Sequence, residues 1–123
     1  MAKYLFEARY TAGGAKGLTR EGGSDRRAAL TKMTEGLGGK LETFYYAFGD
    51  VDAYLIVDVP DSVTAAAIAL AVNQAGAVTV KTVVLIPPED MDKAGKKAVG
   101  YRPALGMPFG HWEVKDEGDD LDA

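Results

Sequence analysis

The sequence lacks cysteine and has a single histidine, His111. Without thiols the chain has neither a disulfide framework nor a thiolate nucleophile. One imidazole is too few for a metal site made of several histidines from one chain, whereas carboxylates remain suitable ligands for a hard cation. We therefore expect no cofactor, and any acid–base chemistry is expected to rely on carboxylates.

Long hydrophobic runs are absent as well. No apolar stretch approaches the ~18 residues of a membrane-spanning helix, and the opening MAKYLFEARY lacks the apolar centre of a signal peptide. We expect a cytoplasmic protein without membrane contacts. The chain has 123 residues, a length that suits one domain with one hydrophobic core.

An excess of positive charge is also missing. The formal net charge is −4, and it arises in the last segment, EVKDEGDDLDA, which carries six acids and one lysine. The rest of the chain holds 12 acids and 13 bases, so the body of the protein is close to neutral. A near-neutral body does not favour nucleic-acid binding. The like charges of the last segment predict that it is mobile.

Apolar residues recur with a period of two in four segments, as in strands with two different faces. Two further segments have apolar stripes at helical spacing, with capping residues before them and glycines after them. The predicted strands cover residues 3–11, 40–48, 53–59 and 77–86, and the predicted helices cover residues 25–39 and 63–76. The glycine-rich AGGAKGLTREGG is expected to hold at most one short helical turn, and PPEDMDKAGKKAVG is expected to be a loop.

The order strand–helix–strand–strand–helix–strand is that of the ferredoxin-like βαββαβ unit. This is an α+β fold with a four-stranded antiparallel sheet, in which the first strand lies between the third and the fourth. Both helices cover one face, so the other face must meet a partner, a ligand or the C-terminal segment. We assign residues 1–92 to this domain and residues 93–123 to a C-terminal extension.

Part of the chain resembles a known family. The stretch KLETFYYAFGDVDAYLIVDVPD, the alanine-rich helix that ends in NQAGAV, and the stretch VKTVVLIPPEDM are similar to the GYD domain family, from Met1 to about Asp92. The resemblance implies a ferredoxin-like fold of the dimeric α+β barrel type, and no established reaction. The Gly-x-Tyr-Asp signature of the family matches at Gly49 and Asp52, with Val51 in place of the usual aromatic residue.

The segment that carries this signature, GDVD, has two interpretations. Asp50 and Asp52 are a pair of carboxylates that could bind a cation or exchange protons. Alternatively, Gly49, Asp50 and Asp52 form the turn between two strands, because Gly and Asp tolerate the backbone geometry of tight turns. We favour the turn.

The uncovered face of the sheet gathers polar side chains among apolar ones. Glu7, Arg9, Tyr54, Asp58 and Lys81 belong to neighbouring strands and fall on this face. As a site, they would provide two candidate catalytic carboxylates, Glu7 and Asp58, and three binding residues, Arg9, Tyr54 and Lys81. The alternative is that these charges pair with one another across neighbouring strands or contact a second subunit.

The C-terminal extension begins with YRPALGMPFGHWEV, which is too apolar to stay free in solution. We expect this segment to lie along a protein surface as a dimer clasp or a cavity lid, so that His111 becomes a candidate binding residue of a neighbouring site. The alternative for His111 is an ordinary surface position.

The open apolar face predicts a homodimer, or a larger assembly of copies of this chain. The function that these features favour is a homodimer that holds a small molecule in a cavity at its open sheet faces. The alternative is a structural or regulatory module without chemistry of its own, which assembles through the same face and the C-terminal segment.

Overall fold

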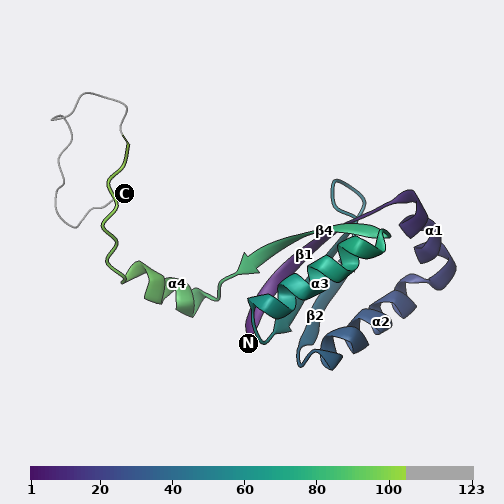
Figure 1. The fold of residues 1–123 in the computed structure, drawn as a ribbon, viewed down its shortest axis with the longest axis horizontal. Coiled ribbons are helices and arrows are strands. Elements are labelled where there is room, and N and C mark those ends of the chain that lie inside the picture. Colours follow the sequence, from purple (N-terminus) through teal and green to yellow (C-terminus); the bar gives the residue numbers. More distant parts are fainter. Residues whose placement is uncertain (105–123) are drawn as a thin grey trace. The chain divides into compact units, whose positions relative to one another are not determined.

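Residues 1–104 are the part of the chain that the computed structural model describes. The strands are β1 (Ala2–Tyr10), β2 (Lys40–Tyr46), β3 (Ala53–Val59) and β4 (Val78–Leu85), and the helices are α1 (Ala12–Glu21), α2 (Gly23–Gly36), α3 (Ser62–Ala75) and α4 (Pro88–Gly95). Figure 1 shows β1 running between β4 and the β2 side of the sheet, with α3 in front of the strands and α2 beside β2.

The four strands form one antiparallel sheet in the order β2-β3-β1-β4. The prediction that the first strand lies between the third and the fourth is therefore confirmed. The pairing of β2 with β3 is interrupted by a β-bulge between Leu41 and Thr43. A bulge inserts one extra residue into a strand and so reverses which face the following side chains point to.

Alternate residues of the two central strands form the core. The buried side chains of β1 and β3 pack beneath Ala65 and Ile68 of α3, and the half-buried Leu30 and Met33 of α2 join them. The buried strand residues are Tyr4, Phe6, Ala8, Ala53, Leu55, Val57 and Val59. This is the α+β, ferredoxin-like arrangement expected from the sequence, with α2 and α3 on one face and, within residues 1–91, the opposite face open.

Helix α1 corrects the expectation of a connection with at most one helical turn. Thr11 caps the helix by accepting a hydrogen bond from the Gly14 backbone N–H at 3.0 Å. The Thr11 backbone also donates to the Ala77 carbonyl at 3.0 Å, which ties the start of α1 to the start of β4. Glycine disfavours a helix in isolation, but here a side-chain cap and tertiary contacts outweigh that preference.

The remaining helices begin at capped or acidic positions. Gly22, with φ of 97°, ends α1 and precedes α2, so α2 begins before the predicted Ser24 cap. Asp61 caps α3 by accepting hydrogen bonds from the Thr64 backbone N–H at 2.9 Å and from the Thr64 hydroxyl at 2.7 Å. These hydrogen bonds hold the pKa of the Asp61 carboxyl below its usual value.

The segment after β4 was expected to be a loop, and this expectation is wrong for α4. Glu89 and Asp90 lie in the first turn of α4 and Lys93 lies in the last. These charges interact favourably with the two ends of the helix dipole and so stabilise the helix. The chain divides into a first unit, Met1–Met91, and a second unit that begins at Asp92. Within residues 1–104 no helix combines the length and apolar character needed to cross a bilayer.

Candidate functional site

The open face of the sheet carries an apolar row beside a polar one. Leu5 of β1 lies opposite Ile56 of β3 on one side and Val83 of β4 on the other. Two residues further along β1, Glu7 lies opposite Tyr54 and Lys81 in the same way. Directly opposite residues in a sheet have Cβ atoms about 4.5–5.5 Å apart. The register thus brings Glu7, Tyr54 and Lys81 together, as a converging site requires.

The polar row of Glu7, Tyr54 and Lys81 has no side-chain partner within the described part of the chain. None of the ion pairs or side-chain hydrogen bonds found within residues 1–104 involves Glu7, Tyr54 or Lys81. Tyr45 of β2 extends the row, since it lies opposite Tyr54, and its side chain is 70% exposed. The row therefore offers a carboxylate, an ammonium and two phenols to whatever covers this face.

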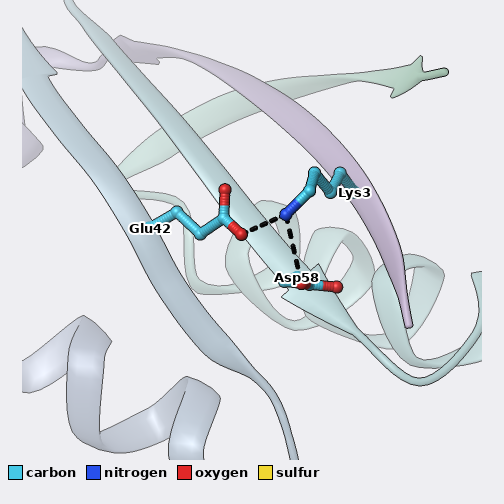
Figure 2. A network of polar contacts seen from close by, with 3 residues as sticks. All are labelled: Lys3, Glu42 and Asp58. Atoms are coloured by element: carbon cyan, nitrogen blue, oxygen red, sulfur yellow. Dashed lines mark hydrogen bonds and ion pairs between the residues drawn. The ribbon is translucent and has the colours of Figure 1, made fainter. Parts of the chain in front are cut away.

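Asp58 lies at the other side of the apolar row and has a different set of partners. Its Oδ2 accepts a hydrogen bond from the Lys3 ammonium at 3.2 Å. The same ammonium, which Figure 2 shows reaching from β1 across β3, also donates to Glu42 of β2. These two acceptors raise the pKa of the Lys3 ammonium, Glu42 first and then Asp58. Asp58 is thus one of three members of an ion-paired network, with Lys3 and Glu42, and it does not lie opposite Glu7 in the sheet.

Arg9 stands apart from both groups. Its guanidinium is 4.0 Å from the Asp50 carboxylate, whose side chain is 98% exposed. An ion pair of this kind in water contributes little to stability. The five predicted site residues therefore separate into three places on one face: Asp58 at one end, Glu7 with Tyr54 and Lys81 in the middle, and Arg9 at the other end.

Lys3 and Glu42 were missed by the sequence analysis. Lys3 has the same parity as Leu5 and Glu7, so the period of two places it on the open face. Glu42 carried no usable signal, because the bulge between Leu41 and Thr43 makes the faces of β2 unreadable from alternation alone.

The GDVD segment forms a loop between β2 and β3, as the turn interpretation requires. Asp52 Oδ2 accepts a hydrogen bond from the Tyr10 backbone N–H at 2.8 Å. The Asp52 backbone donates to the Ala8 carbonyl at 2.9 Å and accepts from the Ala47 N–H at 2.8 Å. Asp52 thus fastens the loop to β1. Val51 is buried, and no group of His, Asp or Glu residues within residues 1–104 has the arrangement of a metal site.

His111 and most of the apolar C-terminal segment lie outside the described residues. The clasp remains a prediction. Within the described residues, Tyr101 at the start of that segment is 72% exposed.

A second cluster of polar groups lies on the helix side of the sheet. The Tyr10 and Tyr46 phenols lie close enough to influence each other's pKa, and the Tyr46 hydroxyl donates to the Gly23 carbonyl at 3.2 Å. Arg26 of α2 lies close enough to influence both phenols and pairs with Glu21 at 3.7 Å. Burial, followed by the neighbouring Tyr46, raises the pKa of Tyr10 to about 12.

The raised pKa of Tyr10 predicts a loss of stability in alkaline solution. Below pH 10, the usual phenol pKa, Tyr10 is neutral in both folded and unfolded chains and its contribution is complete. As the pH rises from 10 to about 12 the unfolded chain ionises first, so the free energy of unfolding decreases. In urea unfolding experiments over this range, we expect a shallower decrease for Tyr10→Phe than for the wild type. Identical pH profiles would show that Tyr10 is not protected from ionisation.

Comparisons with known proteins place the chain in a family. A search of curated proteins and a search of solved structures returned no match. The model of the GYD domain family matches residues 4–94, which is well over half of the chain. This range includes most of β1, all of β2 to β4 and nearly all of α4. The sequence resemblance is thereby confirmed, and the chain belongs to the GYD domain family.

Proposed function

We propose that the protein is a homodimer that pairs its open sheet faces and holds a small molecule between them, beside Glu7, Tyr54 and Lys81. The observation that carries the proposal is the polar row, which finds no side-chain partner among residues 1–104, next to the apolar row of Leu5 and its neighbours. Small-molecule sites combine an apolar lining with a few polar groups in this way.

The apolar row of the open face supports pairing with a second copy. Leu5 and Ile56 are half-buried, and Val83 is 40% exposed, although no element of residues 1–91 covers them. Covering ~500 Å² of apolar surface contributes on the order of 12 kcal/mol before the cost of association.

The dimer is tested by placing a charge in the apolar row. We expect the wild type to have twice the chain mass of 13.0 kDa by light scattering. Leu5→Asp should reduce it to the mass of one chain, because two carboxylates would be buried face to face. Val63→Asp is the matched control, since Val63 is a 75% exposed residue of α3 on the helix side. A wild type that is already monomeric at micromolar concentration contradicts the proposal.

The small molecule is tested on the dimer itself. Native mass spectrometry of the purified protein should show a bound compound that denaturation releases. The paired substitutions Glu7→Gln and Lys81→Met should remove it and leave the dimer intact. A dimer whose mass equals that of two bare chains, and whose melting temperature is unchanged by both substitutions, contradicts a ligand at this row.

The second candidate is a module that assembles without a ligand. The Lys3–Asp58–Glu42 network favours it, because these charges are satisfied within one chain and are not free for chemistry. The substitutions at Glu7 and Lys81 separate the two functions: an assembly module keeps its partners when the polar row is neutralised.

A further inference from the structure

The helix side of the sheet contains an apolar cavity of about 70 Å³. Two alanines form part of its floor: Ala8 of β1 and Ala53 of β3 are buried and directly opposite each other in the register. Val80 of β4 flanks Ala8 on the other side. Side chains this small leave space above the two central strands that the surrounding residues do not fill.

The helices form the walls of this cavity and do not close it. Helix α2 packs mainly against β2, and α3 mainly against β4 and β3. Leu30 and Met33 of α2 line one side, and Ile68 and Val72 of α3 line the other. An apolar cavity has no partners for water, so it stays dry and takes up small apolar molecules instead. The lining thus selects an apolar group.

One end of the cavity is polar and positively charged. Tyr10 and Arg26 line it there, while Thr34, the other polar lining residue, already donates its hydroxyl to the Leu30 carbonyl at 2.8 Å. The Arg26 side chain is 40% exposed, and its partner Glu21 is 3.7 Å away at the surface. Such an exposed ion pair is weak, so a stronger anionic partner from a ligand can replace it.

Tyr10 also lines a wider groove of about 310 Å³ outside the cavity. Leu18 of α1, Tyr46 and the fully exposed Phe48 share the lining of this groove. A molecule whose apolar end occupies the cavity therefore has its other end at Arg26 and the two phenols, with the groove beyond it.

We propose that this cavity binds the apolar end of a small monocarboxylate, with the carboxylate against Arg26 and the Tyr10 hydroxyl. The volume is several times the roughly 10–15 Å³ that one water needs, which suits a single ring or a short branched chain. Arginine and phenol groups are matched donors for a carboxylate. Among the described residues, Arg26 is the one cation that lines the cavity, and the carboxylates of Glu21 and Asp52 are nearby. This balance favours one negative charge over a phosphate.

The site lies on the opposite side of the sheet from the paired faces, so it does not depend on the dimer. The experiment uses the full chain and 4-fluorobenzoate as the probe, followed by fluorine NMR and by the methyl signals of Leu30, Ile68 and Val80. Saturable binding with shifts at these methyls is expected. Arg26→Gln should weaken binding of the carboxylate by at least about tenfold and leave the neutral 4-fluorobenzyl alcohol within about twofold. Arg27 is at the next position of α2 but outside the cavity lining. Arg27→Gln should therefore leave the affinity for both probes unchanged.

A second variant tests the location independently of charge. Ala53→Val adds two methyl groups to the cavity floor and should weaken the binding of both probes. Circular dichroism and thermal melting verify that the variant is folded. Three results overturn the proposal: no saturable binding to the folded wild type at millimolar probe, equal weakening by Arg26→Gln and Arg27→Gln, or shifts confined to open-face residues such as Leu5 and Ile56.

Discussion

Replacing Gly14 with alanine is expected to lower the free energy of unfolding by about 3 kcal/mol, at the upper end of the cost of overpacking. Gly14 is the buried residue of α1. A Cβ atom at this position would lie 1.8 Å from the Ala77 carbonyl oxygen and 2.7 Å from its carbon. Both are backbone atoms, so relief requires that α1 move away from β4. That movement would strain the hydrogen bond from the Thr11 backbone to the same carbonyl.

Gly17 provides the matched control in the same helix. A Cβ atom there meets nothing within 4 Å. Gly17→Ala is therefore expected to stabilise the protein by roughly 0.5–1 kcal/mol through helix propensity alone. Urea unfolding followed by circular dichroism measures both variants. If Gly14→Ala is as stable as Gly17→Ala, the start of α1 does not lie against the start of β4.

Much of the fold follows from alternation and from the order of elements. The sequence predicts that Tyr4, Phe6 and Ala8 share one face of β1, because side chains of a strand alternate between its two faces. The same alternation places Glu7 and Arg9 on the opposite, open face. The pairing of the strands decides which of these residues meet. The register places Glu7 opposite Tyr54 and Lys81, and it places Asp58 opposite Lys3, with which it forms an ion pair. A list of residues on one face does not contain that information.

Two features escaped sequence reasoning for other physical reasons. Helix α1 contains Gly13, Gly14 and Gly17, so its local propensity argues against the helix that tertiary contacts stabilise. The interior cavity depends on Ala8 meeting Ala53 across two strands that are far apart in the sequence. Each alanine alone is an ordinary core residue. The cavity arises because the register places these two small side chains directly opposite each other.

The bulge in β2 explains a third difficulty. Before the bulge, Leu41 lies opposite the inward-facing Val57, and after it Phe44 lies opposite the inward-facing Leu55. Leu41 and Phe44 are three positions apart, which a regular strand would place on opposite faces. Alternation along the sequence therefore could not show which aromatic residues of β2 face inward. The same shift brings Glu42 to the open face, where it meets Lys3.

The two aspartates of GDVD are expected to differ sharply when each is replaced by alanine. Asp52→Ala removes the acceptor of the Tyr10 backbone N–H, a part-buried hydrogen bond of 2.8 Å. Leaving that donor unsatisfied should lower the free energy of unfolding by about 1–3 kcal/mol. Asp50→Ala should change it by less than about 0.5 kcal/mol, because Asp50 is exposed and makes only the 4.0 Å contact with Arg9.

Asparagine at position 52 separates the hydrogen bond from the charge. Its side-chain carbonyl can accept from the Tyr10 N–H in place of the carboxylate, so Asp52→Asn is expected to recover most of the stability that Asp52→Ala loses. Urea unfolding at neutral pH compares the three variants with the wild type. If Asp52 and Asp50 prove equally dispensable for stability, the loop is held by its backbone contacts to Ala8 and Ala47 alone. The signature aspartate would then require an explanation other than fastening the loop to β1.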